Sequence, residues 1–272
     1  MPTLKEIAAA GLTRLIEEGH SRLPLDESAR GILRGWMRGR SSAPAVATAP
    51  PPAVQQQGTG AAAPATVEEK LEYLRRRAEH WAPARRLGSL RDTMVFAVGN
   101  PHARLVLVGE APGYDEERLR EPFVGKAGQK LNDILRAMGL AREQIYITNI
   151  CKFRPSMGNA QGTANRPPTE EEIAACLPLV LAELRAIQPA CIVCLGGTAA
   201  RGLLGGAGSV GALRGKWWEC QGVPVRVTYH PSYLLRNETL SARRAVWEDM
   251  LAAMERLELP ISDKQRGYFL QK

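Results

Sequence analysis

The 272-residue chain has no run of about 18 apolar residues, which argues against a membrane-spanning helix. Its first residues lack the basic start, apolar centre and small-residue cleavage site of a secretion signal. Cysteine is also scarce, and five cysteines, an odd number, do not describe a disulfide framework. We therefore expect a soluble, reduced protein that is cytoplasmic, in the bacterial cytosol or nucleoid.

The sequence also lacks a GxxxxGK[ST] phosphate loop, which argues against a P-loop NTPase. Acidic residues are outnumbered, because 28 Asp and Glu stand against 36 Lys and Arg, for a formal net charge of +8. Excess positive charge attracts polyanions and raises encounter rates with them, so nucleic acid is the leading candidate partner. A basic protein from an arginine-rich proteome explains the charge equally well.

Composition divides the chain into four segments. Residues 1–40 carry an apolar helical stripe and predict an N-terminal helical segment. Residues 41–66 are rich in Ala and Pro and have no charge, so we expect a disordered linker. Residues 67–260 form the predicted main domain, which is apolar enough to build a core, and residues 261–272 form a C-terminal tail.

Within the main domain, four short apolar runs rich in β-branched residues predict strands buried on both faces. They are ARLVLVGE (103–110), QIYITNI (144–150), ACIVCLGG (190–197) and VPVRVTYH (223–230). Helical patterns, one with a Thr169/Glu172 capping box, separate the runs. The alternation predicts an α/β fold, a three-layer α/β/α sandwich with a central four-stranded, mainly parallel sheet. Ligands bind such sheets at the carboxyl ends of the strands, here Gly109–Glu110, Asn149, Gly196–Gly197 and His230.

Short motifs accompany these strands in a characteristic order. They are GEAPG (109–113), PFVGKAG (122–128), TNICKFRP (148–155), NRPPTEEE (165–172), LGGTAA (195–200), RGK (214–216) and TYHPSYLLR (228–236). In order and spacing they resemble the uracil-DNA glycosylase superfamily, and most of all its family-four branch. The resemblance covers roughly residues 80 to 257. It implies a sandwich of the same kind and hydrolysis of the bond between uracil and deoxyribose in DNA, so residues 67–260 are the expected catalytic domain.

The resemblance implies a pocket for a base that is flipped out of DNA. Gly109, Ala111, Phe123 and Asn149 match the uracil pocket. Phe123 corresponds to the aromatic that stacks on the base, and Asn149 to the amide that pairs with the edge of the base. His230 corresponds to the histidine that donates to the base carbonyl where negative charge develops.

Three further polar residues, Glu110, Glu116 and Asn165, match positions that hold and activate water in family members. Glu116 lies in the charged run DEERLRE, for which a solvated helix face is an equal alternative. The role of Asn165 is equally open. Together with His230, these residues are the candidate catalytic set.

The resemblance also implies a DNA-binding surface. The segment SYLLR (232–236) matches a loop that wedges into the minor groove and fills the vacated stack. The Gly-Gly-Thr turn at 196–198 precedes a helix N-terminus suited to a phosphate, and the basic residues of RGK are expected on backbone phosphate rather than on bases. The residues assigned to DNA binding are Gly197, Thr198, Arg214, Lys216, Ser232, Leu234, Leu235 and Arg236.

Members of the family-four branch usually carry an iron–sulfur cluster held by four cysteines. The corresponding positions here are Ala82, Arg85, Phe153 and Cys176, and one ligand cannot hold a cluster. Cys151 lies two residues from an expected ligand, so we expect it on the same face of the strand but about 6–7 Å away. Cys191 and Cys194 form a CxxC, but an extended segment points them to opposite faces, so zinc is not expected. We predict no iron–sulfur cluster, no metal and no cofactor.

The expected function is a monofunctional DNA N-glycosylase that acts on uracil-containing DNA as a monomer, with residues 1–40 able to recruit a repair or replication partner. The motifs contain no evident amine nucleophile, although Lys126, Lys152 and Lys216 leave that point open. Two alternatives remain. One is a non-catalytic module that binds uracil or damaged DNA. The other is a glycosylase for another deaminated base, such as hypoxanthine or xanthine, against which the Asn149 edge contact argues.

Overall fold

The computed structural model describes residues 66–158, 161–206 and 208–270. The predicted N-terminal segment 1–40 and all but the last residue of the predicted linker 41–66 lie outside the described residues. The domain boundaries therefore remain predictions. In the part of the chain that is described, no helix is long and apolar enough to cross a membrane.

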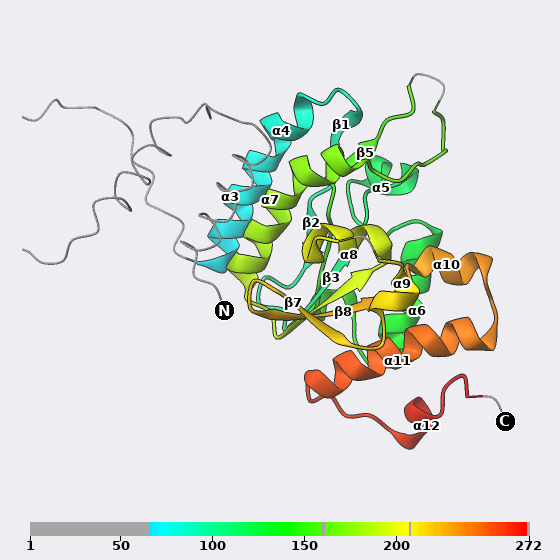
Figure 1. Ribbon diagram of the computed structural model, residues 1–272. Coiled ribbons are helices and arrows are strands. Elements are labelled where there is room, and N and C mark those ends of the chain that lie inside the picture. Colours follow the sequence, from blue (N-terminus) through cyan, green and yellow to red (C-terminus); the bar gives the residue numbers. More distant parts are fainter. Residues whose placement is uncertain (1–65, 159–160, 207, 271–272) are drawn as a thin grey trace, which may run out of the picture. The chain divides into compact units, whose positions relative to one another are not determined.

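The centre of the domain is a six-stranded sheet with the spatial order β2-β4-β3-β6-β8-β7. Figure 1 shows strands at the centre of the domain with helices around them. Its four inner strands are parallel and are the four that the sequence predicts: β3 (Leu105–Gly109), β4 (Tyr146–Asn149), β6 (Cys191–Leu195) and β8 (Val223–Thr228). The outer strands β2 (Ala97–Gly99) and β7 (Trp217–Cys220) pair antiparallel with β4 and β8. The sequence did not indicate these two edge strands.

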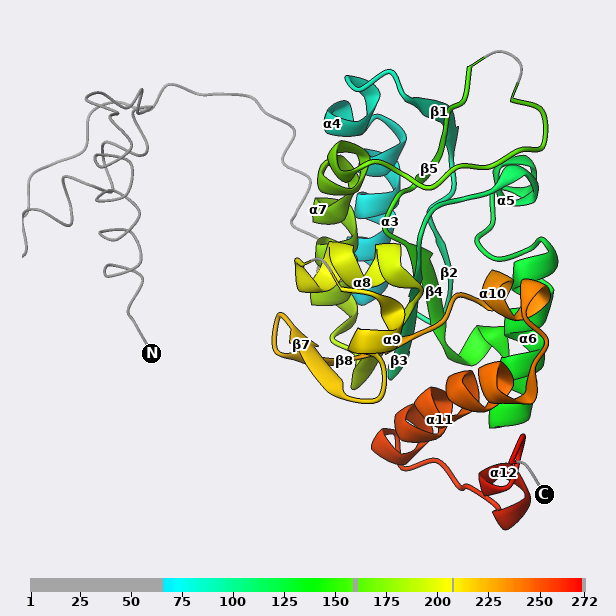
Figure 2. The same ribbon diagram turned by 45° about the vertical axis from the view of Figure 1, so that its right-hand side comes forward.

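Helices cover both faces of the sheet, which confirms the predicted sandwich (Figure 2). One face packs against α3 (Val67–Glu79), α7 (Glu170–Ile187) and α8 (Gly197–Leu204), and the other against α6 (Lys126–Met138) and α11 (Leu240–Arg256). Alternation along a strand explains both cores, because Val106 and Val108 join the first while Leu105 and Leu107 join the second. Cys194 and Cys191 divide in the same way, as the sequence predicts.

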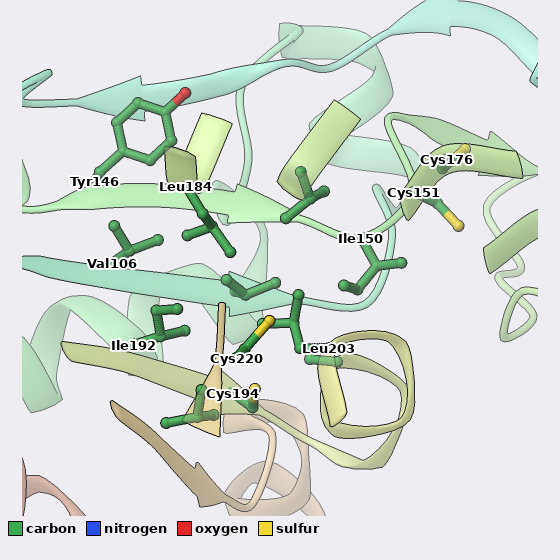
Figure 3. Packing of buried hydrophobic residues seen from close by; sticks show 14 of the residues in the cluster. Val106, Tyr146, Ile150, Cys151, Cys176, Leu184, Ile192, Cys194, Leu203 and Cys220 are labelled. Carbon is green, nitrogen blue, oxygen red and sulfur yellow. The ribbon is translucent and has the colours of Figure 1, made fainter. Parts of the chain in front are cut away.

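Figure 3 shows part of the first core, in which Val106 and Ile192 of the sheet pack with Leu184 of α7 and Leu203 of α8. The helix α7 begins at the predicted capping box: Thr169 Oγ1 accepts from the Glu172 amide at 3.3 Å, and the Glu172 carboxylate accepts from the Thr169 amide at 2.8 Å.

The remaining described elements are short. They are α4 (Ala82–Arg85), α5 (Tyr114–Leu119), the 3-10 helix η1 (Arg142–Gln144), α9 (Val210–Leu213), α10 (Pro231–Arg236), α12 (Asp263–Arg266) and the strands β1 (Leu90–Met94) and β5 (Phe153–Pro155). The strands β1 and β5 pair antiparallel in a sheet of their own. The C-terminal tail is tied to the domain, because Trp247 Nε1 donates to the Gln265 carbonyl and Gln265 Nε2 donates to the Ala137 carbonyl.

Candidate active site

A cavity of about 500 Å³ opens at the carboxyl ends of the four parallel strands. Gly109 and Asn149 are register partners at the ends of β3 and β4. In the sheet, β3 lies between β4, which follows it in the chain, and β6, which comes later, so the strand order reverses at β3. Sheets of α/β proteins bind ligands at such a position. The predicted residues that line the cavity are Glu110, Ala111, Glu116, Phe123, Asn149, Asn165, Gly197, His230, Ser232 and Arg236.

The Phe123 ring and the Asn149 amide lie directly against Gly109. A β-carbon on Gly109 would lie 2.4 Å from Phe123 Cζ and 2.3 Å from Asn149 Oδ1, closer than real atoms approach. Both side chains are buried, at 5% and 2% exposure. The absence of a side chain at Gly109 therefore leaves room for an aromatic face and an amide edge beside one another, which together suit a flat heterocycle.

His230 is the N-cap of α10, and its ring stacks near Phe123 with 5.6 Å between centroids. The Ser232 amide donates to His230 Nδ1 at 3.2 Å, so the neutral ring carries its proton on Nε2. Burial and, to a smaller extent, the positive charge of Arg236 together lower the pKa of His230 to about 4. At neutral pH the residue is therefore an uncharged imidazole with an Nε2–H donor.

Glu110 is held by a residue of α8. Thr198, in the first turn of α8, donates its hydroxyl to Glu110 Oε2 at 2.5 Å. Thr198 is buried, at 5% exposure, so its hydroxyl serves Glu110 rather than reaching out to a phosphate as the sequence suggested. Gly197 lines the cavity at the helix N-terminus.

Glu116 lies on α5 and binds backbone amides. Its carboxylate accepts from Gly113 at 3.1 Å, from Val124 at 3.0 Å and from Gly125 at 2.8 Å. The solvated helix face considered from the sequence is therefore not the role of this carboxylate. It joins the loop after β3 to the segment that carries Phe123.

Asn165 is oriented by Arg154, a residue that the sequence analysis did not select. Arg154 is buried, and its Nε donates to Asn165 Oδ1 at 2.9 Å, while Nη2 donates to the Gly162 and Ala164 carbonyls at 3.0 and 2.7 Å. Because the amide oxygen is engaged, the amide nitrogen of Asn165 faces Gly113 at the cavity wall. The KFRP motif contains this arginine, but its contact with a side chain 11 positions away cannot be predicted from the motif.

The segment 232–236 forms the helix α10, whereas the sequence analysis expected a loop. The helix divides the predicted wedge residues. Leu234 is buried in the core with 6% exposure, while Leu235 is 39% exposed. A buried side chain cannot enter a base stack, so Leu235 and Arg236 remain the candidates and Leu234 anchors the helix.

The two basic residues of RGK are in different environments. Arg214 Nε donates to Asp249 Oδ2 at 3.0 Å, and its Nη2 bonds the Ala245 carbonyl, so these contacts are internal and give no support to the predicted phosphate contact. Lys216 is exposed, with Nζ 4.4 Å from the centroid of the Trp218 ring. Lys216 remains a candidate phosphate contact.

The residues at the four cluster positions do not fit an iron–sulfur cluster. The Arg85 guanidinium lies 4.5 Å from the centroid of the Phe153 ring, so two of these positions are occupied by a cation–π pair. Phe153 is fully buried. In the described part of the chain, no group of three or more His, Cys, Asp or Glu could hold a metal ion.

Cys151 is not on the same strand as Phe153, because the chain leaves β4 at Asn149 and begins β5 at Phe153. The sequence-based placement of Cys151 on one strand face with Phe153 was therefore wrong. Its thiol is free and forms a hydrogen bond with the free thiol of Cys176, an interaction that raises the pKa of Cys151 and lowers the pKa of Cys176. Two core thiols, one of them at a non-corresponding position, still fall short of four ligands.

Comparisons with known proteins show the family of the chain. A family model described as the uracil DNA glycosylase superfamily matches residues 96–251. The Type-4 uracil-DNA glycosylase of Thermotoga maritima is 43% identical over 164 residues, which are 59% of this chain and 81% of that protein. The Type-4 uracil-DNA glycosylase of Archaeoglobus fulgidus is 40% identical over 162 residues, 57% of this chain and 78% of that protein. With more than half of its length matched by the family model, the chain belongs to the uracil-DNA glycosylase superfamily.

Proposed function

We propose that the protein is a monofunctional uracil-DNA glycosylase, which flips deoxyuridine out of DNA, hydrolyses the N-glycosidic bond and leaves an abasic site. The observation that carries this proposal is the meeting of Phe123, Asn149 and His230 at one cavity. The names of the relatives, Type-4 uracil-DNA glycosylases, support it.

Each of the three residues has a separate task. The Phe123 ring stacks on the flipped base, and the Asn149 amide pairs with the edge of uracil, where one donor and one acceptor are adjacent. As the bond between the sugar and the base breaks, its electron pair passes to the base and positive charge develops on the sugar. The His230 Nε2–H donates to the base carbonyl that gains negative charge, and this donor is present without protonation of the ring.

A water molecule must then attack the sugar carbon. Glu110, fixed by Thr198, and the amide nitrogen of Asn165, fixed by Arg154, are the polar groups placed to hold it. Glu116 is a weaker candidate for this task because three backbone amides already occupy its oxygens. We assign water binding to Glu110 and Asn165, and a positioning role to Glu116.

Hydrolysis by water alone is favoured by the absence of an amine at the cavity. None of the described residues that line it is a lysine. Lys152, one of three lysines that left this point open, is fully buried and pairs with Glu183 at 2.5 Å. A lysine committed to a core carboxylate cannot reach a sugar carbon in the cavity.

We also propose that the protein works without an iron–sulfur cluster. In place of ligands, the Arg85–Phe153 pair joins α4 to β5, and Trp81 Nε1 donates to the Ala175 carbonyl at 2.6 Å, next to Cys176. These contacts connect α4, β5 and α7, elements that a metal would otherwise brace.

DNA binding is assigned to Leu235, Arg236 and Lys216. We also propose a cytoplasmic monomer in which residues 1–40 recruit a partner.

The test is a substrate panel in which enzyme exceeds duplex DNA that carries uracil, hypoxanthine, xanthine or thymine. Wild-type protein should release uracil alone, and His230→Ala and Asn149→Asp should each slow release by roughly 100-fold or more. Release of a purine instead would assign the site to another deaminated base. Tight binding to the uracil duplex without any abasic product would identify a non-catalytic module.

A further inference from the structure

Phe123 has an unusual backbone conformation. Its φ is +55°, in the left-handed region that bulky residues rarely adopt. Such a conformation costs free energy and persists only where the surroundings fix it, and it is concentrated at functional sites. The strained residue here is the one proposed to stack on the base.

Arg142, at the start of η1, holds the carbonyl side of this strained segment. Its Nη1 donates to the Phe123 carbonyl at 3.1 Å, and its Nη2 donates to the Pro122 carbonyl at 2.8 Å. The same guanidinium is fixed by Asn132 Oδ1 at 3.1 Å and Glu121 Oε1 at 3.0 Å. Its side chain is only 18% exposed, so the contacts are largely shielded from water.

Glu116 holds the amide side of the same segment, through its bonds to Val124 and Gly125. Gly128 allows the backbone of Phe123 to lie close to α6, since a β-carbon on Gly128 would lie 1.9 Å from the Phe123 carbonyl oxygen. The Arg142 guanidinium therefore binds the carbonyls of Pro122 and Phe123. The Glu116 carboxylate binds the amides of the next two residues, Val124 and Gly125. The peptide planes on both sides of the strained residue are fixed.

From this arrangement we infer that Arg142 is a positioning residue for base recognition, which acts by holding Phe123 in its left-handed conformation. Arg142 does not line the cavity and touches no reacting group. The inference rests on the proposed function, because it gives Phe123 the base-stacking role. Without the guanidinium, the Pro122–Phe123 segment relaxes toward ordinary backbone angles, and the ring leaves the position that Gly109 allows.

The experiment compares Arg142→Gln, Arg142→Lys and a control, Arg136→Gln, in single-turnover uracil release. Arg136 is a matched control because its side chain is 76% exposed and, in the described part of the chain, forms an ion pair only with the exposed Asp133 on the same helix. Arg142→Gln should slow release roughly 10- to 100-fold, the scale expected from misplacing a contact by about 1 Å. Arg142→Lys lacks the paired guanidinium donors, so its rate of uracil release should lie between those of Arg142→Gln and wild type. The release rate of the control should stay within about twofold of wild type.

A double-mutant cycle with Phe123→Ala separates positioning from general stability. If Arg142 acts through Phe123, Arg142→Gln should slow release less than about twofold in the Phe123→Ala background. An equal loss in both backgrounds would overturn the inference, as would full activity of Arg142→Gln.

Binding to a duplex with 2′-fluorinated deoxyuridine, which resists cleavage, gives a readout independent of turnover. Arg142→Gln should lose the preference for this duplex over a thymine duplex and keep its affinity for the thymine duplex. A wild-type protein that prefers the fluorinated duplex but releases no uracil would refute the proposed function and leave the positioning role standing. Preference retained by Arg142→Gln would refute the positioning role whatever the activity.

Discussion

Replacing Gly109 with alanine is the sharpest perturbation of the pocket. The backbone of Gly109 is outside the left-handed region, so alanine is tolerated there and the added methyl group acts only by its volume. It would lie 2.4 Å from Phe123 Cζ and 2.3 Å from Asn149 Oδ1. Restoring ordinary contacts requires both side chains to shift by about 1 Å, which at a reacting centre costs roughly 100-fold in rate.

The assay is single-turnover release of uracil from a duplex, with the free energy of unfolding measured by urea on the same samples. We expect Gly109→Ala to slow release by roughly 100-fold and to lower stability by about 1 to 3 kcal/mol, as overpacking does. Gly211→Ala in α9 is the control, because its added methyl group would meet nothing closer than Tyr229 Oη at 3.7 Å. Release by Gly109→Ala within about threefold of wild type would refute the proposal that uracil release depends on the positions of Phe123 and Asn149.

Three other predictions follow from particular side chains. The pKa of His230 is about 4 in the folded protein and 6.5 ordinarily, so as pH falls the unfolded chain takes up a proton on this histidine before the folded protein does. The free energy of unfolding should therefore fall by at most about 3 kcal/mol as pH drops from about 6.5 to about 4. Urea unfolding of His230→Gln at the same pH values should not show this contribution. Lys152→Met should lower the free energy of unfolding by about 3 kcal/mol because it leaves the Glu183 carboxylate buried without its cation, and a loss under 1 kcal/mol would contradict this. Thr198→Val should slow uracil release roughly tenfold by removing the hydroxyl that fixes Glu110, and an unchanged rate would show that Glu110 needs no such support.

The sequence was sufficient for the layers of the fold and for the strand ends at which several candidate site residues lie. Continuous β-branched runs identify buried parallel strands, and the residues that end those strands must lie at one edge of the sheet. Asn149 and His230 were found in this way. The edge strands β2 and β7 were not predicted because three or four residues carry too little pattern. The loop expected at 232–236 came from the family resemblance, and the structure has the six-residue helix α10 there.

What the sequence could not provide were the partners of the site residues. Thr198 reaches Glu110 across 88 positions, and Arg142 reaches Phe123 across 19, so neither pair is visible as local spacing. The sequence also gives no indication of the positive φ of Phe123, since the residue there is not glycine or asparagine, which commonly adopt such angles. These long-range contacts determine which way each functional group faces.

The central claim is that this pocket removes uracil without a metal. The most direct measurement is uracil release under single-turnover conditions together with the iron content and visible spectrum of the same purified sample. The account predicts complete release of uracil by a colourless protein that contains no iron. A coloured protein whose rate of release rises and falls with its iron content would contradict it.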